Sequence, residues 1–242
     1  MVKKVIVSIV LVLSVVLFSN CSYAEEKGLL GYWKFDEGKG EIVKDFSGKG
    51  NDGTIYGAVA TAGKIGQALS FDGVGNYVDC GKTAGNLGTD PFTIECWVKS
   101  ENNEASYFIE KRQKDGHQWL FTLSAGRPYF NYNDGNSNYA YKVSNTVLQQ
   151  GQWYHLAAVV DRPSSYHPII CVNGVVGKGR IGQQGNPETA NMDNTGNLYF
   201  GRNTYRNAKN YFNGSIDEVR IYNRALTETE IKNHYENENQ SI

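Results

Sequence analysis

Residues 45–52 gather several side-chain oxygens in a short loop that also contains glycine. Asp45, Ser47, Asn51 and Asp52 supply the oxygens, and Gly48 lets the backbone turn so that carbonyl groups can point inward. Calcium prefers about six to eight oxygen ligands, and several of them are commonly backbone carbonyls. We therefore expect a structural Ca²⁺ ion held by Asp45, Gly48, Asn51 and Asp52.

Asp217 is a further carboxylate that we assign to this metal site. In a regular strand it would share a face with Val219 and Ile221, which are typical core residues. A carboxylate on such a face must be paired or bound to a metal. The alternative is that Asp45 and Asn51 cap turns while Asp217 accepts hydrogen bonds from backbone N–H groups. Both interpretations stay open at the level of the sequence.

The segment 129–141 interleaves aromatic rings with amides and one carboxylate. Flat rings can cover the C–H faces of sugars, and planar polar groups can bind pairs of hydroxyl groups. This composition predicts a carbohydrate-binding surface, and the segment 207–211 has a similar character. The alternative is a solvent-exposed hairpin without a ligand. The residues that we assign to the surface are Tyr129, Tyr132, Asn133, Asp134, Tyr139 and Tyr141.

No catalytic residue is assigned from the sequence. Glycanases that retain configuration place two carboxyl groups about 5 Å apart, which in a strand requires acids on alternate residues. Glu218 adjoins Asp217 and would point to the opposite face, so the two cannot act on one bond. The residues that could serve a lyase match no lyase motif that we recognise, and they are His155, Tyr154, Arg162, Tyr166 and His167.

The first 24 residues have the composition of a secretion signal. Lys3 and Lys4 precede the apolar run 5–18, and Ser22 and Ala24 place small residues at the positions that a signal peptidase reads. The apolar run is short for a membrane span. We expect cleavage after residue 24 and an extracellular or periplasmic protein. A lipid anchor at Cys21 is the alternative.

Three cysteines follow the predicted signal: Cys80, Cys96 and Cys171. The odd count allows at most one disulfide within the chain and leaves at least one thiol. A Cys96–Cys171 bond would close a long loop and stabilise the fold by about 4 kcal/mol. The alternative is three buried, reduced thiols that pack as small hydrophobic groups.

The composition excludes several classes of protein. Aromatic residues make up 12% and charged residues 20% of the 242 residues, which is typical of a packed fold and unlike a disordered chain. The 24 Lys and Arg against 25 Asp and Glu leave a net charge of −1, and the basic residues form no cluster along the sequence. We therefore expect neither a nucleic acid nor another polyanion as a partner.

Almost every periodic stretch of the chain repeats every two residues, which is typical of β-strands. Asn173 and Gly174 lie between two apolar runs and predict a tight hairpin. One helix is expected from Thr227, because Thr227 and Glu230 have the spacing of a capping box. We place one domain in residues 25–242, after the signal peptide 1–24. Examples of the strand pattern are Gly31–Phe35, Phe92–Lys99 and Trp153–Val160.

Several longer motifs occur in order along the chain. They are Gly31–Gly40, Asp45–Thr54, Phe71–Gly73, Trp153–Ala157, Leu198–Arg202 and Phe212–Leu226. Together they resemble the laminin-G-like, concanavalin A-like jelly-roll family of lectins and glucanases. The resemblance implies an all-β sandwich of two antiparallel sheets, one of them curved, with ligands on the concave face or the edge loops. It also implies that the strand with Asp217 lies against the loop with Asp45.

We therefore expect an exported, lectin-like module that is not an enzyme. Its partner would be a glycan or another extracellular surface, and a structural calcium ion would support the fold. The same architecture serves proteins of several functions, so the fold alone does not decide between them. The alternatives are a polysaccharide lyase or hydrolase with an unrecognised active site, and a module that adheres to proteins.

Overall fold

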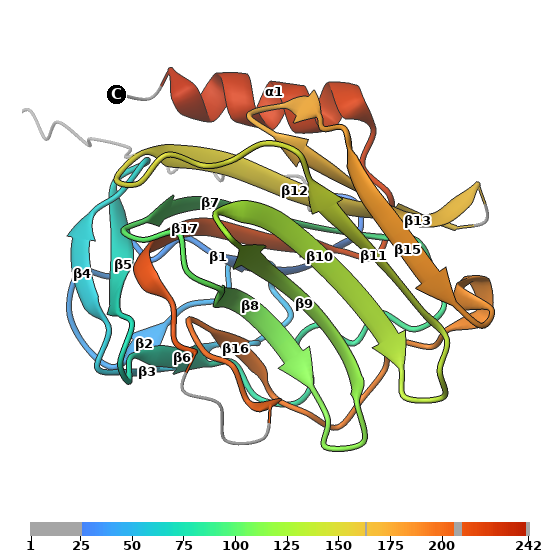
Figure 1. Ribbon diagram of the computed structural model, residues 1–242. Helices are drawn as coiled ribbons and strands as arrows, with labels where there is room; N and C mark the ends of the chain where they lie inside the picture. Colours follow the sequence, from blue (N-terminus) through green and yellow to red (C-terminus); the bar gives the residue numbers. More distant parts are fainter. Residues whose placement is uncertain (1–25, 163, 206–209, 241–242) are drawn as a thin grey trace, which may run out of the picture.

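The computed structural model describes residues 26–162, 164–205 and 210–240 of the protein. Two antiparallel sheets of strands are stacked face to face, and the helix α1 (Glu228–Asn239) lies across the outside of one of them (Figure 1). The all-β sandwich with a short C-terminal helix is therefore confirmed. The predicted signal peptide, the lipid-anchor candidate Cys21 and most of the segment 207–211 lie outside the described residues.

The eight-stranded sheet has α1 on its outer face, and we call it the helix-side sheet (Figure 1). Its order is β14, β13, β12, β7, β17, β5 and β4, with β1 beside β17. Its strands are β1 (Leu29–Trp33), β4 (Val59–Ala62), β5 (Gln67–Asp72), β7 (Phe92–Ser100), β12 (Trp153–Asp161), β13 (Ser165–Val172), β14 (Val175–Val176) and β17 (Asn213–Tyr222).

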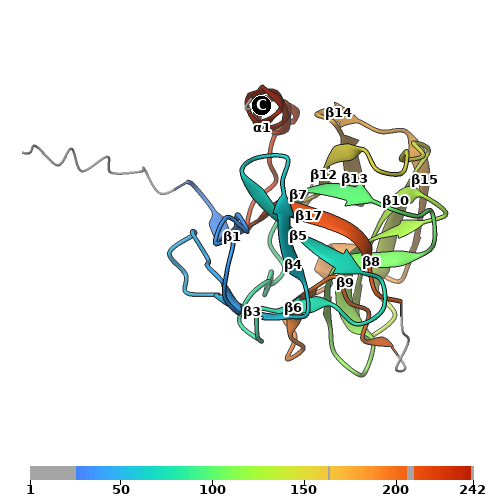
Figure 2. The same ribbon diagram turned by 90° about the vertical axis from the view of Figure 1, so that its left-hand side faces the viewer.

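The nine-stranded sheet is called the open sheet here, and its order is β15, β11, β10, β9, β8, β16, β6, β3 and β2. Figure 2 shows α1 end-on, on the side of the molecule away from β3 and β6 of this sheet. Its strands are β2 (Ile42–Val43), β3 (Gly53–Tyr56), β6 (Tyr77–Asp79), β8 (Ser106–Arg112), β9 (His117–Ser124), β10 (Arg127–Asp134), β11 (Tyr139–Ser144), β15 (Gly179–Gln184) and β16 (Leu198–Phe200). A short 3-10 helix, η1 (Pro187–Thr189), follows β15.

Aromatic side chains fill the space between the two sheets. The ring of Phe92 in β7 lies 6.1 Å from that of Phe130 in β10, and Phe121 of β9 meets Phe130 edge-on at 5.6 Å. All three side chains are fully buried. Because successive side chains of a strand point to opposite faces, this core is formed by one face of each sheet, and the other face of each sheet points away from it.

A β-bulge in β17 decides where Asp217 points. Glu218 has a φ of 51°, and the register of β17 against β7 shifts between Asp217 and Arg220. The extra residue resets the alternation, so that Ile216 and Val219 both point into the core while Asp217 points to the outer face of the sheet. The prediction that Asp217 shares a face with Val219 is wrong for this reason.

The two local predictions for the C-terminal half are confirmed. Asn173 and Gly174 have φ values of 52° and 73° and form the turn between β13 and β14, as a two-residue hairpin of this composition requires. Thr227 caps α1, because its hydroxyl accepts a hydrogen bond from the backbone N–H of Glu230 and the Glu230 carboxylate accepts one from the backbone N–H of Thr227. No helix of the described residues is long and apolar enough to cross a membrane.

The predicted Cys96–Cys171 disulfide is wrong, because both residues are free and buried thiols. Cys96 pairs with Leu156 of β12, whereas Cys171 pairs with the next residue, Ala157. The two thiols therefore point to opposite faces of the helix-side sheet, and β12 separates their strands. Cross-strand spacing alone places them about 10 Å apart, beyond the reach of a disulfide.

Glu95 of β7 lies fully buried in a charged cluster between the helix-side sheet and α1. One carboxylate oxygen accepts a hydrogen bond from His234 Nδ1 at 2.8 Å, and the other lies 3.6 Å from His155 Nε2. Burial acts to raise the pKa of Glu95, but the hydrogen bond from His234 and the nearby charges of His155, His234 and Arg220 outweigh it and lower the pKa to about 2. Glu95 is therefore an ionised carboxylate at neutral pH.

Arg220 connects this cluster to the helix. Its guanidinium lies 2.6 Å from a carboxylate oxygen of Glu238 in α1 and 2.6 Å from one of Glu218 in β17. Trp97 of β7 donates its indole N–H to the second oxygen of Glu238 at 2.5 Å. The helix is therefore held on the sheet by buried charges in addition to apolar contacts such as that of Ile231.

Replacing Glu95 by Gln should lower the free energy of unfolding by about 3–5 kcal/mol near pH 7, because Arg220 and His234 lose a buried counter-charge. The matched control is Glu236→Gln on α1, where an exposed i, i+4 pair with Lys232 is lost and the change should stay below about 0.5 kcal/mol. Urea denaturation of the three proteins measures both effects. Equal stability of the Glu95→Gln variant and the wild type would contradict the prediction.

The pH dependence tests the same cluster. A carboxyl group whose folded pKa is depressed contributes stability above its unfolded pKa, and that contribution disappears as the pH falls through the folded pKa. The wild type should therefore lose stability between about pH 4.5 and about pH 2, and the Glu95→Gln variant should lose less over this interval.

Candidate functional site

Tyrosine and amide side chains occupy the outer face of the open sheet. Tyr129 of β10 and Tyr107 of β8 both lie opposite Thr122 of β9, the strand between them. The residues next to these three along the strands, Phe108, Phe121 and Phe130, point into the core. The alternation therefore exposes the tyrosines on the side away from the core. We call this surface the tyrosine face and define it by Tyr56, Tyr77, Tyr107, Tyr129, Tyr139, Tyr141 and Tyr199, with Gln118, Asn131 and Asn133 between them.

The rings of the tyrosine face form two groups. In one group, Tyr129 and Tyr141 lie on the neighbouring strands β10 and β11 with their ring centres 5.7 Å apart. In the other group, Tyr56 of β3 stacks on Tyr77 of β6 at 4.5 Å, and Tyr77 meets Tyr199 of β16 edge-on at 5.9 Å. Each group offers flat apolar area beside hydroxyl groups, which is the combination that binds sugar rings.

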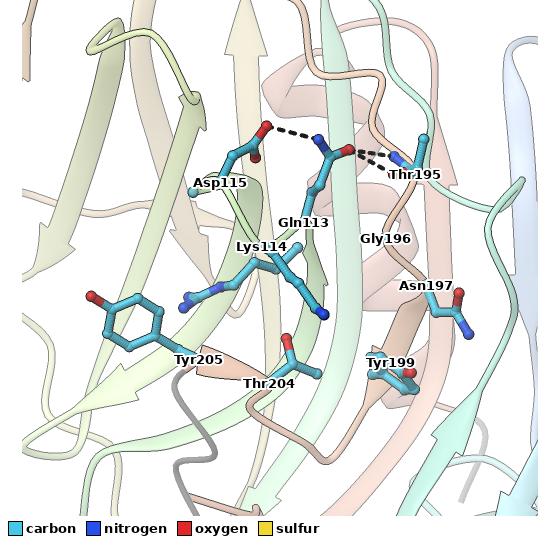
Figure 3. Close-up of a pocket in the computed structure, with 11 residues that line it drawn as sticks. Gln113, Lys114, Asp115, Thr195, Gly196, Asn197, Tyr199, Thr204 and Tyr205 are labelled. Atoms are coloured by element: carbon cyan, nitrogen blue, oxygen red, sulfur yellow. Dashed lines mark hydrogen bonds between the residues drawn. The ribbon is translucent and has the colours of Figure 1, made fainter.

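A cleft of about 920 Å³ opens at the end of β8, beside Tyr199 of the second group of rings. The turn 113–116, the segment 195–199 and the residues Thr204 and Tyr205 surround it, as Figure 3 shows. The Gln113 amide links two of its walls, because its nitrogen donates to Asp115 at 2.8 Å and its oxygen accepts from the backbone N–H of Thr195 at 2.9 Å. The walls of the cleft are therefore tied together by side-chain hydrogen bonds.

Glu110 and Arg112 lie on β8 beside the cleft. Glu110 is fully buried, and one of its oxygens accepts hydrogen bonds from the backbone N–H and the hydroxyl of Thr204. Its other oxygen lies 3.3 Å from the Arg112 guanidinium, which also stacks on the Tyr205 ring at 4.8 Å. Burial raises the pKa of Glu110, and the positive charge of Arg112 opposes this shift. Glu110 therefore orders Thr204 and Arg112 and is not itself accessible to a ligand.

The structure places the predicted sugar-binding residues in three different ways. Tyr129, Asn133, Tyr139 and Tyr141 all lie on the tyrosine face. Tyr132 does not, and its assignment is corrected, because alternation turns it into the core, where it is fully buried and packs against Phe92. The Asp134 carboxylate accepts hydrogen bonds from the backbone N–H groups of Asn136 and Asn138 and closes the turn between β10 and β11. The strands β10 and β11 therefore place every second residue of the predicted segment 129–141 on the tyrosine face.

The oxygens of the predicted calcium loop already accept hydrogen bonds. One oxygen of Asp45 accepts from the backbone N–H groups of Tyr32 and Ser47, and the other accepts from that of Asn51. Asp52 accepts from the backbone N–H of Asp45 and pairs with the Lys44 ammonium at 2.6 Å. Among the described residues, no group of three or more His, Cys, Asp or Glu side chains is arranged to hold a metal ion. N–H donors and the Lys44 ammonium occupy these oxygens, and the calcium site stays a prediction of the sequence.

Asp217 interacts with a different segment of the chain. One of its oxygens accepts hydrogen bonds from the backbone N–H groups of Lys64 and Ile65 at 2.9 and 3.0 Å, in the turn between β4 and β5. The other oxygen is buried without a partner. Burial raises the pKa of Asp217 to about 8. The geometry therefore corresponds to the alternative in which Asp45 caps a turn and Asp217 accepts backbone hydrogen bonds.

One of the two histidines that could serve a lyase, His155, is not accessible. His155 of β12 is fully buried in the charged cluster beneath α1, on the outer face of the helix-side sheet. Glu218 accepts hydrogen bonds from the Tyr32 hydroxyl and from Arg220 in the same region. These groups serve the attachment of the helix and lie on a different sheet from the tyrosine face.

Comparisons with known proteins agree with this architecture. The sequence profile of the concanavalin A-like lectin/glucanases superfamily matches residues 72–232. No curated protein matches the chain. Many solved structures share the fold.

Three of these structures illustrate the range of proteins involved. The binding domain of Paraclostridial mosquitocidal protein 1 has a TM-score of 0.69 and 16% identity, over 86% of this chain and 52% of that chain. Domain 4 of AbnA, a GH43 extracellular arabinanase from Geobacillus stearothermophilus, was solved with arabinotriose and has a TM-score of 0.63 and 21% identity, over 86% of this chain and 98% of that domain. A Trypanosoma rangeli sialidase mutant that displays trans-sialidase activity has a TM-score of 0.61 and 15% identity, over 86% of this chain and 32% of that chain. The chain thus spans about half of the toxin domain, and identities this low show the fold alone.

Replacing Asp217 by Asn should flatten the pH dependence of stability. A carboxyl group whose folded pKa is raised stabilises the fold at low pH, and this contribution is lost as the pH rises from about 4 to about 8. The amide cannot ionise, and its oxygen can still accept the hydrogen bonds of Lys64 and Ile65. Relative to the wild type, the variant should gain stability from about pH 5 to about pH 8, by more than about 1 kcal/mol, in urea denaturation. A gain that does not grow with pH would contradict a raised pKa.

Chelation provides a separate test of the calcium prediction. Because the oxygens of Asp45 and Asp52 are engaged by N–H donors and by Lys44, we expect the same melting temperature with excess EDTA and with millimolar Ca²⁺. A melting temperature that falls in EDTA and recovers with Ca²⁺ would instead support the predicted calcium site. Loss of that response in the Asp217→Asn variant would assign Asp217 to it.

Proposed function

The chain belongs to the concanavalin A-like lectin/glucanases superfamily, and we propose that it is an exported, non-catalytic module that binds a glycan through the tyrosine face. The observation that carries the proposal is the arrangement of rings and amides on the outer side of the open sheet. This face meets no α-helix of the described residues, whereas α1 covers the corresponding face of the helix-side sheet (Figure 1).

The chemistry of the face suits a sugar chain. The rings of Tyr129 and Tyr141 provide flat area for C–H surfaces. Between them and the cleft, the Gln118 amide donates to the Asn131 side-chain oxygen at 2.9 Å, so these two polar groups hold one another in place. Groups that are ordered before binding lose less conformational entropy on binding.

The acids of the face support a binding role over a catalytic one. Asp79 of β6 accepts from the Asn197 amide and from the backbone N–H of Gly81. Glu110 is fully buried and is occupied by Thr204 and Arg112. A glycosidase needs one carboxyl group as an acid and another as a base or nucleophile, both in contact with the substrate. The buried carboxyl group of Glu110 does not meet this requirement.

The comparisons support the same class of function. A solved domain that this chain covers almost completely is part of an arabinanase and was crystallised with arabinotriose. The toxin structure is described as a binding domain. The sialidase match concerns about a third of that protein, so we do not transfer its activity.

Export and metal content are separate parts of the proposal. Export rests on the sequence of residues 1–24, which lie outside the described residues. Calcium stays a prediction of the sequence, and no step of glycan binding proposed here uses a metal ion.

Tyr141→Ala should weaken the binding of whichever glycan an array identifies by about tenfold, because one of the two paired rings is removed. Tyr141→Phe keeps the ring and should bind within about threefold of the wild type. Lys232→Ala on α1 is the control on the opposite sheet and should bind like the wild type. Calorimetric titration of the four proteins measures the affinities. Unchanged affinity of Tyr141→Ala would contradict the use of this face.

The non-catalytic part of the proposal has its own test. Incubation of the protein with a panel of polysaccharides should release neither reducing ends nor unsaturated uronates. Turnover that is retained in purified protein and lost in a Glu110→Gln or His155→Ala variant would show an enzyme instead.

A further inference from the structure

We propose that the glycan is acidic and that Lys114 and Arg202 bind its carboxylate or sulfate groups at the cleft. This inference rests on the glycan-binding function proposed above and specifies the class of ligand. It follows from the positions of the charged groups around the cleft, which the sequence alone does not reveal.

Arg202 is held in position by two tyrosine rings, and its charge lies near that of the buried Glu110. Its guanidinium stacks on Tyr77 at 4.6 Å and on Tyr199 at 5.0 Å from the ring centres. In the part of the chain that the structure describes, it forms no hydrogen bond or ion pair. Stacking fixes the plane of a guanidinium and leaves its N–H groups free at the rim, where they match the two oxygens of a carboxylate or sulfate.

Lys114 lies in the turn between β8 and β9 and is exposed. Figure 3 shows its side chain extending across the cleft toward Thr204 and Tyr199. Like Arg202, it has no hydrogen-bond or ion-pair partner among the residues described in the structure. Lys114 lines the cleft, and Arg202 stacks on Tyr199, which also lines it, so two cations without a direct ion pair lie near one another.

The acids nearby make no direct ion pair with these two cations. The two oxygens of Asp115 accept hydrogen bonds from Gln113 and from the backbone N–H of His117. Asp79 is bound by Asn197, and Glu110 is buried against Arg112. Hydrogen bonds from neutral donors leave the charge of a carboxylate in place, so the cleft is not positive overall. An anionic group would be held by direct contacts with the Lys114 ammonium and the Arg202 guanidinium.

A third unpaired cation indicates that the ligand is a chain. Arg180 of β15 stacks on Tyr141 at 5.7 Å and is exposed, with no ion pair among the described residues. Five strand spacings separate β15 from β16, which precedes Arg202, and this corresponds to about 24 Å. One monosaccharide cannot reach both arginines, but an oligosaccharide lying across the tyrosine face can.

The test compares polymers that differ in charge and little else. Polygalacturonate is compared with its methyl ester, and dextran sulfate is compared with dextran, in affinity electrophoresis and calorimetry of the full chain without its signal peptide. We expect binding of at least one anionic polymer that exceeds its neutral counterpart by about tenfold or more. The pair that responds distinguishes a carboxylate from a sulfate. Affinity should also fall as NaCl is raised from about 50 to about 300 mM.

Two variants locate the charge. Arg202→Gln and Lys114→Gln should each weaken binding of the anionic polymer by about threefold to tenfold and reduce the salt dependence. Lys232→Gln on α1 should change neither. Circular dichroism checks that each variant is folded.

The outcomes separate this inference from the proposed function. If a neutral glycan binds as well as its anionic counterpart and Arg202→Gln has no effect, the inference is wrong while glycan binding stands. If no glycan of either kind binds, both are wrong. Equal competition by a single-stranded oligonucleotide would show recognition of charge alone and would overturn the assignment to a saccharide.

Discussion

The alternation of side chains along each strand is the constraint on which the other features depend. Two stacked sheets share one core, so each has one face toward the core and one face left over. In the helix-side sheet, the remaining face is covered by α1 and holds Glu95, His155 and Arg220. In the open sheet, the same alternation exposes Tyr129 and Tyr141. The covered face therefore serves to attach the helix, and the uncovered face is available to a ligand.

The charged cluster beneath α1 is tolerated because the register of the strands aligns opposite charges. Arg220 of β17 pairs directly with Glu95 of β7, and the bulge at Glu218 produces this register. Without the extra residue, Val219 would point toward the helix and Arg220 into the core. The strained φ of Glu218 is thus compensated by the ion pairs of Arg220 with Glu218 and Glu238. Ion pairs of this kind favour one orientation of the helix, since displacement of α1 would leave the Arg220 charge buried without Glu238.

Local chemistry in the sequence predicted much of the fold. The Asn173-Gly174 turn and the capping box of Thr227 depend on residues a few positions apart, so their signals are complete in the sequence. Asp217 was placed on the wrong face because a bulge at a non-glycine residue gives no such signal. The Cys96–Cys171 bond was wrong because the register across β12 places the thiols on opposite faces. Tyr132 could have been recognised, since it alternates with Phe130, which is a core residue.

The positions of the charged side chains in the folded protein were the feature that was hardest to predict from the sequence. The net charge is −1 and no basic segment occurs, so a polyanion was not expected as a partner. The fold gathers Lys114, Arg180 and Arg202 on one side of the sandwich from three separate parts of the chain. On the other side, it brings Glu218 and Glu238 to Arg220 beneath the helix. A nearly neutral protein can therefore place several cations without direct ion pairs on one face, and these local contacts, rather than the net charge, decide which groups can bind there.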